Sequence, residues 1–407
     1  MYRARYLEDV ILRINKKFKV LYLAGPRQVG KTTLLKHLSA RTERNYVSLD
    51  DLDKRSLAQN DPGLFLQQYP APLLIDEAQY APQLFPYIKI KVDASTKKGQ
   101  YWLTGSQQFS LMKNVTESLA GRVGILNLLG LSRAEEKEER KKTKAFLPGS
   151  RTRKSRQAVP KNIHDLFKRI LRGSFPELLH KDAPPVELFY NSYLQTYIDR
   201  DLRDIFKVAK IETFHKFLQL CAARTGQVLN MSDLARDTGI SVTTVSDWLG
   251  ILTASSQIFL LQPYWANFSK RLVKAPKLYF LDTGLAAYLT KWKTPEAAAS
   301  GAMAGAFLET FVVAEIIKSY WYRGELPALY YYRDKEGNEV DLLIEKDDVI
   351  SPIEIKLAAT ISKNDLKGID YLRRKIPNAG KGAIISLYPE QLSFDKDNEC
   401  IPATMIN

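Results

Sequence analysis

The sequence contains little cysteine and histidine, the residues from which disulfide frameworks and structural zinc sites are built. Its 407 residues include 2 cysteines and 4 histidines. Cys221 and Cys400 are too few for a disulfide framework or a cysteine-based metal cluster, and the histidines lie far apart without ligand spacing. We therefore expect neither structural zinc nor stabilising disulfides.

Long apolar runs are also missing. No run approaches the roughly 18 residues that a membrane helix needs. At the N-terminus, apolar residues follow helical spacing with Glu8 and Asp9 between them, which is unlike the apolar core of a secretory signal. These absences predict a soluble, cytoplasmic protein with no membrane partner.

Acidic residues are outnumbered by basic ones. The chain has 60 Lys+Arg against 45 Asp+Glu, a net charge of +15. This balance favours an anionic partner such as nucleic acid, although many proteins with the same balance bind none. The length predicts about two to three domains, and an apolar content of 45% is sufficient for their cores.

A glycine-rich segment lies between an apolar run at 20–24 and an apolar-periodic stretch at 34–38. It reads G-x-x-x-x-G-K-T, with the residues Gly25, Pro26, Arg27, Gln28, Val29, Gly30, Lys31 and Thr32. The glycines allow successive N–H groups to wrap a phosphate at a helix N-terminus. The lysine then neutralises β- and γ-oxygens, and the threonine hydroxyl ligates Mg²⁺. The context favours a phosphate loop over a chance turn, and we expect these residues and Thr33 to bind ATP.

A second motif, at residues 72–77, predicts an apolar strand that ends in two carboxylates, Asp76 and Glu77. In a Walker B motif the aspartate holds Mg²⁺ directly or through water, and the glutamate orients and deprotonates the attacking water. A solvent-exposed helix cap is the alternative interpretation. The upstream phosphate loop favours the catalytic one.

A further strand is predicted at residues 101–106, and it ends in polar side chains. In ATPases with a glutamate beside the Walker B aspartate, such a strand lies between the two Walker strands and presents a polar sensor to the γ-phosphate. Ser106 or Thr104 fits that position. The alternative is an ordinary strand-to-turn ending.

Four motifs together resemble a family of bacterial and archaeal AAA-type ATPases, in which the ATPase domain is fused to a C-terminal region of poorly understood function. They are the phosphate loop, L-L-I-D-E-A-Q at 73–79, L-T-G-S at 103–106 and S-L-A-G-R at 118–122. The resemblance implies that Arg122 reaches the γ-phosphate as a sensor or arginine finger, in cis or in trans. A local ion pair is the alternative for Arg122, and a capping or packing role is the alternative for Gln79.

The middle of the chain combines a basic connector with a helix-turn-helix pattern. Nine Lys or Arg and no acidic residue occur at 140–161, which predicts a linker or mobile loop that is solvated or contacts nucleic acid. Residues 226–264 predict two capped helices around Gly239, and 258–281 would add a wing hairpin. The second helix exposes no Lys or Arg, so the charge directed to phosphates is assigned to the wing residues Lys270, Arg271, Lys274 and Lys277. Packing, or weak nonspecific DNA binding, is favoured over sequence-specific recognition.

The C-terminal third predicts a helix, three strands, a helix and a strand at 305–387. Asp341 lies on one strand of the hairpin, and period-two alternation places Glu354 and Lys356 on one face of the next strand. Two carboxylates and a lysine are what a Mg²⁺-dependent phosphodiesterase needs, and Glu309 could complete the metal sphere. A salt-bridged trio on the sheet is the alternative.

This D…E-x-K pattern in an α-β-β-β-α-β order resembles the restriction-endonuclease-like, or PD-(D/E)-x-K, superfamily. Val340 replaces the proline that usually precedes the aspartate. The resemblance implies either a nuclease or a fold retained for binding after loss of catalysis.

These observations predict an α/β chain in four parts. They are a P-loop ATPase domain at 1–132, a basic linker or mobile loop at 133–161, a helical connector with a winged helix at 162–290, and a restriction-endonuclease-like domain at 291–407. The predicted activity is Mg²⁺-dependent ATP hydrolysis coupled to a nucleic-acid transaction, with nuclease activity left open. The alternative is a nucleotide-dependent switch that binds a protein partner, and self-association is compatible with both.

Overall fold

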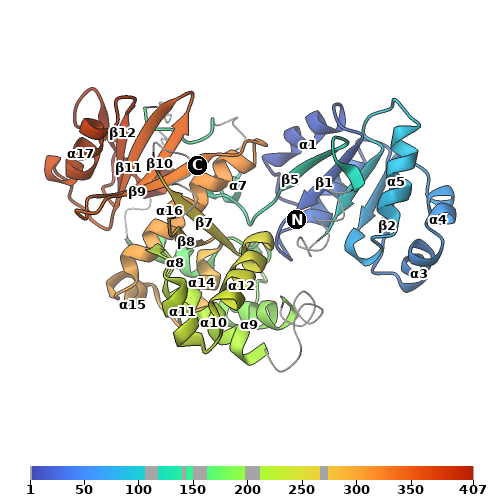
Figure 1. Cartoon of the computed structure of the whole chain (residues 1–407), viewed down its shortest axis with the longest axis horizontal. Helices are drawn as coiled ribbons and strands as arrows, with labels where there is room; N and C mark the ends of the chain where they lie inside the picture. The colour runs from blue at the N-terminus through green and yellow to red at the C-terminus, as the bar shows by residue number, and fades with distance from the viewer. Residues whose placement is uncertain are drawn as a thin grey trace.

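The computed structural model describes residues 2–105, 118–139, 144–149, 163–197, 211–265 and 274–406. Figure 1 shows the N-terminal α/β part at one end, the C-terminal sheet at the other, and a group of helices beneath the junction between them. Among the helices in these ranges, none is long and apolar enough to cross a membrane.

The N-terminal part is a parallel five-stranded sheet with the order β2-β3-β4-β1-β5. Every residue of the interior strand β1 is buried, as is typical of a parallel sheet covered on both faces. The predicted fourth strand, β4, lies between β3 and β1, which confirms the expected placement between the two Walker strands. The strands are β1 (Val20–Ala24), β2 (Asn45–Ser48), β3 (Leu73–Asp76), β4 (Tyr101–Thr104) and β5 (Val123–Asn127).

Helices cover both faces of this sheet. Apolar side chains of α1 and α2 pack on one face, and those of α3, α4 and α5 belong to the core on the other. The sequence places polar caps where these helices begin: Asp51 and Asp61 accept backbone hydrogen bonds at the first residues of α3 and α4. The helices are α1 (Leu7–Asn15), α2 (Lys31–Ser39), α3 (Leu52–Asn60), α4 (Pro62–Gln68) and α5 (Leu84–Asp93).

The connector is mainly helical. Helices α11 and α12 lie where the helix-turn-helix pattern predicts them, with Asn230 and Ser241 as side-chain caps and Gly239 in the left-handed conformation between them. The helices between β5 and α16 are α7 (Arg133–Glu136), α8 (Ile163–Arg172), α9 (Val186–Tyr197), α10 (Ile211–Ala223), α11 (Met231–Thr238), α12 (Val242–Ala254), α14 (Thr283–Leu289) and α15 (Pro295–Ser300), of which α7 precedes the predicted connector and α15 follows it.

A nine-stranded sheet with the order β13-β14-β12-β11-β10-β9-β7-β8-β6 spans the connector and the C-terminal part. β7 pairs with β9 in parallel, so the sheet continues across residue 290, where the sequence predicts a domain boundary. The strands are β6 (Gln227–Val228), β7 (Ile258–Pro263), β8 (Lys277–Phe280), β9 (Ala328–Arg333), β10 (Glu339–Lys346), β11 (Val349–Lys356), β12 (Gly382–Ser386), β13 (Leu392–Ser393) and β14 (Asn398–Pro402). Helices α16 (Ala304–Trp321) and α17 (Lys367–Lys375) complete the predicted helix and strand order.

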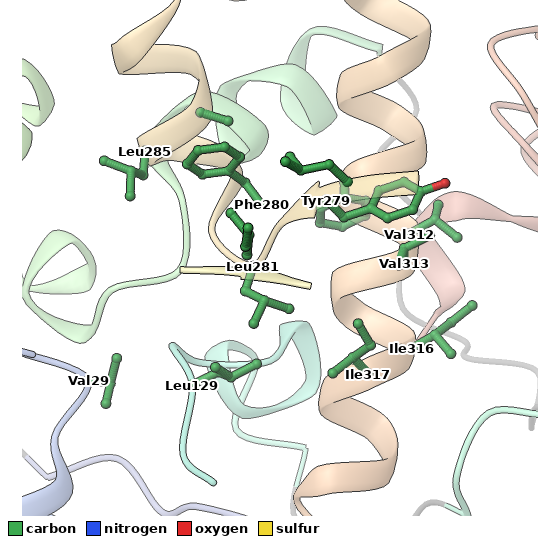
Figure 2. Close-up of a cluster of buried hydrophobic side chains, with 14 of the residues drawn as sticks. Val29, Leu129, Tyr279, Phe280, Leu281, Leu285, Val312, Val313, Ile316 and Ile317 are labelled. Carbon is green, nitrogen blue, oxygen red and sulfur yellow. The ribbon is translucent and has the colours of Figure 1, made fainter. Parts of the chain in front are cut away.

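One hydrophobic core joins the phosphate loop to the C-terminal half. Val29 and Leu129 from the ATPase side belong to the same buried cluster as Leu281 after β8 and Ile317 of α16 (Figure 2). Because protein interiors are close-packed, such a core transmits displacement between the elements that share it. The nucleotide-loop region and α16 therefore form parts of one packed body.

Candidate functional site

The predicted phosphate loop connects β1 to α2 with the backbone that its glycines require. Gly25 has φ 147°, and a Cβ atom there would overlap the carbonyl oxygen of Leu128. Gly30 has φ 92° and caps the N-terminus of α2. Side chains rarely adopt these angles, so both positions favour glycine. The loop thus presents the N-terminus of α2, where backbone N–H groups attract anions.

Lys31 is buried and points into the loop. Its Nζ donates hydrogen bonds to the carbonyl oxygens of Gly25 at 2.9 Å and Pro26 at 2.7 Å. An ammonium held there can exchange carbonyl oxygens for phosphate oxygens without leaving the loop. The role predicted for Lys31 in binding phosphate stays a prediction.

The predicted Mg²⁺ ligands lie side by side. The Thr32 hydroxyl donates to Asp76 Oδ1 at 2.8 Å, and the Tyr46 hydroxyl donates to Asp76 Oδ2 at 3.2 Å. The Thr104 hydroxyl also donates to Asp76 Oδ1. A hydroxyl and a carboxylate beside a phosphate loop are suitable oxygen ligands for Mg²⁺. The residues present therefore fit a magnesium ion.

Glu77 follows Asp76 in the left-handed conformation, with φ 56°. Its backbone N–H donates to Thr104 Oγ1 at 3.2 Å, and Gln79 Nε2 donates to its carboxylate. Gln79 is thus a direct hydrogen-bond partner of the predicted general base. A capping or packing role is the alternative that the sequence suggests for this side chain. Ser106, the other predicted sensor residue, lies outside the described residues.

Arg122 is placed far from the phosphate loop of its own chain. It precedes β5 at the edge where β1 begins, whereas the phosphate loop follows the end of β1. Its guanidinium pairs with Asp93 at 2.5 and 2.9 Å. This is the local ion pair given above as the alternative to a nucleotide contact. Because Arg122 lies at the opposite end of β1 from the phosphate loop, it cannot contact the γ-phosphate of ATP bound to its own chain. Action in trans stays a prediction.

A cavity of about 750 Å³ opens over the phosphate loop. This volume is within the roughly 300–1,000 Å³ of small-molecule sites. Its walls include N-terminal residues and connector residues that sequence reasoning missed, because no short motif marks them. They are Tyr2, Arg3, Arg5, Leu131, Pro176, Glu177, His180, Phe189 and Thr196. The Arg3 guanidinium also donates a long hydrogen bond, at 3.5 Å, to the carbonyl oxygen of Leu179, which lies between Glu177 and His180 in the chain.

Arg5 is a buried cation that joins the phosphate loop to the C-terminal half. It donates to the carbonyl oxygens of Val29 at 3.0 Å and Leu129 at 2.8 Å, and to the Tyr322 hydroxyl at 3.2 Å. Its Nε pairs with the buried Glu135 at 3.1 Å. The two ends of this contact, Val29 and Tyr322, lie in the nucleotide loop and directly after α16.

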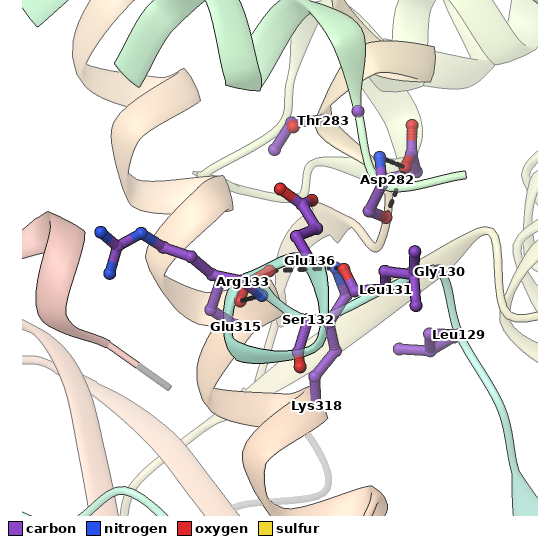
Figure 3. Close-up of polar contacts among 12 residues, drawn as sticks. Leu129, Gly130, Leu131, Ser132, Arg133, Glu136, Asp282, Thr283, Glu315 and Lys318 are labelled. Carbon is purple, nitrogen blue, oxygen red and sulfur yellow. Dashed lines mark hydrogen bonds and ion pairs between the residues drawn. The ribbon is translucent and has the colours of Figure 1, made fainter. Parts of the chain in front are cut away.

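The segment after β5 is also tied to α16 by polar contacts (Figure 3). The Arg133 N–H donates to Glu315 at 2.8 Å, and Lys318 Nζ donates to the Leu131 carbonyl at 3.2 Å. Nearby, Asp282 accepts from the backbone and hydroxyl of Ser174, both at 2.8 Å. These buried groups are hydrogen-bonded, so the contact between the ATPase side and α16 is specific as well as apolar.

In the C-terminal part, the structure brings together the side chains of the D…E-x-K pattern. Asp341 Oδ2 accepts the Ile355 N–H at 2.8 Å, and Lys356 Nζ pairs with Glu354 at 2.8 Å. Burial, followed by the Asp341 carboxylate, raises the pKa of Glu354 to about 8. The same two causes raise the pKa of Glu309 to about 7.

A buried lysine, which the sequence analysis did not place here, lies among the carboxylates of the predicted metal site. Lys277, predicted as an exposed wing charge, is only 3% exposed, and its ammonium lies among three carboxylates. Glu309 is therefore a partner of Lys277 and Tyr279. In the described ranges, no three Asp, Glu, His or Cys residues are arranged to hold a metal ion. The predicted divalent-metal site at Asp341, Glu354 and Glu309 does not fit this geometry.

Comparison with known families divides the chain in three. Residues 17–136 match a family model described as an AAA domain. Residues 163–296 and 304–406 each match a model described as a domain of unknown function. Uncharacterised proteins of Mycobacterium bovis and Mycobacterium tuberculosis are each 29% identical over 348 residues, which is 84% of this chain and 71% of theirs. The N-terminal part is thus an ATPase-like P-loop domain.

Comparison with solved structures matches this chain to a Walker-type ATPase of Pyrococcus abyssi, among others. It is 15% identical with a TM-score of 0.43, over 70% of this chain and 94% of that one. The RuvB Holliday junction branch migration motor of Thermotoga maritima is 17% identical with a TM-score of 0.29, over 63% of this chain and 90% of that one.

Proposed function

We propose that this chain binds ATP at the phosphate loop with Mg²⁺ and hydrolyses it. The convergence of Thr32, Asp76 and Thr104 beside Lys31 is the observation that carries the proposal. Thr32 and Asp76 would hold Mg²⁺, which neutralises charge on the β- and γ-oxygens. Lys31 binds the same oxygens from within the loop.

The proton of the attacking water would go to Glu77. Its carboxylate follows β3 at the edge of the sheet where the phosphate loop lies, and Gln79 supports it by a hydrogen bond. A positioned general base of this kind contributes about 10²–10⁴-fold to the rate. Thr104 contacts both Asp76 and the Glu77 backbone, so it links the metal ligand to the base.

The proposal is tested by ATP binding and hydrolysis in the Lys31→Ala variant. Titration calorimetry and a phosphate-release assay should both lose their signal. Lys91→Ala, which changes an exposed lysine of α5 that does not line the cavity, is the matched control and should retain both. ATP affinity and turnover that survive unchanged in Lys31→Ala would overturn the proposed site.

For the C-terminal half we favour the nucleotide-dependent switch over the nucleic-acid transaction. Helix α12 exposes Thr243, Ser246 and Asp247, and no Lys or Arg lies within it. A helix without these side chains cannot make the bidentate contacts that read guanine. The burial of Lys277 removes one more charge from the group assigned to phosphates.

A DNA-binding measurement separates the two functions. A switch that binds a protein partner should show little affinity for random-sequence duplex, with or without ATP. If the basic connector contacts phosphates instead, affinity should fall steeply from low to physiological salt. Neutralising Arg151, Arg153, Lys154 and Arg156, which lie outside the described ranges, should then flatten that slope.

A further inference from the structure

Six charged side chains form a cluster where the connector meets the C-terminal hairpin. They come from β8, α16, β10 and β11, and we refer to them as the charge cluster: Lys277, Glu309, Glu339, Asp341, Glu354 and Lys356. The resemblance to metal-dependent nucleases implies a divalent ion among these carboxylates. Their contacts in this chain point to a different occupant.

Lys277 lies at the centre of three of the four carboxylates. Its Nζ is 2.6 Å from Glu339 Oε1, 3.1 Å from Glu309 Oε1 and 3.8 Å from Asp341 Oδ1. The Tyr279 hydroxyl, two residues along β8, donates to the same Glu309 oxygen at 2.5 Å. A buried ammonium needs such partners, because an unpaired charge in the interior is costly.

Two further carboxylate oxygens of the cluster also have partners. Asp341 Oδ2 accepts the Ile355 N–H, and Glu354 pairs with Lys356. Glu354 is only 4% exposed, and a Cβ atom at Gly368 in the first turn of α17 would overlap its carboxylate. Mg²⁺ requires near-octahedral oxygen ligands at about 2.0–2.1 Å and keeps several waters. The enclosed pair of Glu354 and Lys356 leaves little room for the ligands and waters that surround Mg²⁺.

We infer that Lys277 is the resident cation of the charge cluster and excludes a divalent ion from it. A divalent ion bound to Asp341 or Glu309 would lie within a few ångströms of the ammonium, and the repulsion would be strong because the Lys277 side chain is only 3% exposed. The cluster then joins β8 of the connector to α16 and the β10–β11 hairpin. It serves as an ionic joint between two parts of the chain, without metal-dependent phosphodiester hydrolysis.

Removing the lysine should therefore open the cluster to metal. The measurement is Mn²⁺ binding by electron paramagnetic resonance without nucleotide, in an Asp76→Asn background that removes the ligand at the phosphate loop. The background protein should bind no Mn²⁺ at the cluster. Adding Lys277→Met should create a site at least about tenfold tighter than any residual binding, a change of about 1.4 kcal/mol. Asp341→Asn should abolish that site.

Two further variants keep the test decisive. Lys274→Met changes an exposed lysine three residues earlier and should leave Mn²⁺ binding as in the background. Lys277→Arg keeps the positive charge and should also bind no Mn²⁺, with a folded circular-dichroism spectrum. If Lys277→Met fails to fold, the inference is tested by Mn²⁺ binding to the Asp76→Asn protein alone. Mn²⁺ binding there that is lost in Asp341→Asn, or Mn²⁺-dependent DNA cleavage lost in the same variant, would overturn the inference.

Discussion

The Thr32 hydroxyl donates a 2.8 Å hydrogen bond to Asp76 across a sequence separation of 44 residues. The contact joins the first turn of α2 to the end of β3, which are not adjacent in the chain. Because Asp76 also accepts from Thr104 and Tyr46, its carboxylate is oriented by partners from three other elements. Such supporting contacts fix a ligand before the metal arrives.

If Asp76 binds Mg²⁺, replacing it should weaken the effect of Mg²⁺ on ATP affinity. In the wild type, Mg²⁺ should strengthen ATP binding. In Asp76→Asn that gain should fall by roughly 10- to 100-fold, the scale for disturbing a metal site. Calorimetric titrations with ATP, in Mg²⁺ and in EDTA, measure the difference. An undiminished Mg²⁺ effect in Asp76→Asn would remove Asp76 from the site.

If Glu77 is the general base, replacing it should slow ATP hydrolysis without weakening ATP binding. Glu77→Gln keeps the size of the side chain but removes its basicity, so ATP should bind normally and hydrolysis should slow at least about 10²-fold. Gln79→Ala, which removes the hydrogen bond to Glu77, should cause a smaller loss in kcat with little change in KM. Phosphate release under saturating ATP measures both. Normal hydrolysis by Glu77→Gln would show that another group is the base.

Two glycines predict opposite effects of the same substitution. Gly25→Ala would overlap the Leu128 carbonyl at a backbone angle unfavourable for alanine, so nucleotide binding should be lost. Gly305 lies exposed in α16 with no atom near its would-be Cβ. Gly305→Ala should therefore stabilise the fold by about 0.5–1 kcal/mol. Thermal unfolding and ATP titration of both variants compare the two positions.

The cavity walls predict that the connector contacts the nucleoside part of ATP. Glu177→Ala should weaken ATP binding but leave the affinity for inorganic tripolyphosphate unchanged, because the phosphates contact only the loop. Asp182→Ala, an exposed acid two residues after His180 that does not line the cavity, is the control and should alter neither. Equal ATP affinity in Glu177→Ala and wild type would exclude this contact while leaving the phosphate loop intact.

Arg5 predicts a large loss of stability from a residue outside every motif. Arg5→Met leaves the buried Glu135 without its cation, and breaking a buried pair in this way costs about 3–5 kcal/mol. Arg13→Met, an exposed arginine of α1, should change the free energy of unfolding by less than about 0.5 kcal/mol. Urea unfolding followed by circular dichroism distinguishes the two. Similar midpoints for both variants would contradict the role given to Arg5.

Local patterns predicted most elements that carry the chemistry. The phosphate loop, the strand ending in Asp76 and Glu77, and the β10–β11 hairpin all have short-range signals, because glycine angles and period-two alternation act within a few residues. β5, β6, β13 and β14 were not predicted, since each is only two to five residues long and gives a weak pattern. The placement of β4 followed from the resemblance and not from its own residues.

Partnerships between distant segments could not be predicted in the same way. Lys277 has the sequence context of a solvent-exposed wing residue, and only the fold places it beside Glu309 and Asp341. Arg122 follows a glycine near the sensor strand in sequence, yet the parallel pairing of β1 and β5 puts it at the opposite edge of the sheet. Charged residues carry little information about which distant carboxylate they meet.

The parallel pairing of β7 with β9 has a practical consequence for dissecting this chain. Any truncation between residues 263 and 328 would separate two hydrogen-bonded neighbours and convert interior strands into open edges. Open edges with unpaired N–H and C=O groups promote aggregation. Isolated halves are therefore expected to precipitate, so the contribution of each half must be assigned by point substitution in the intact chain.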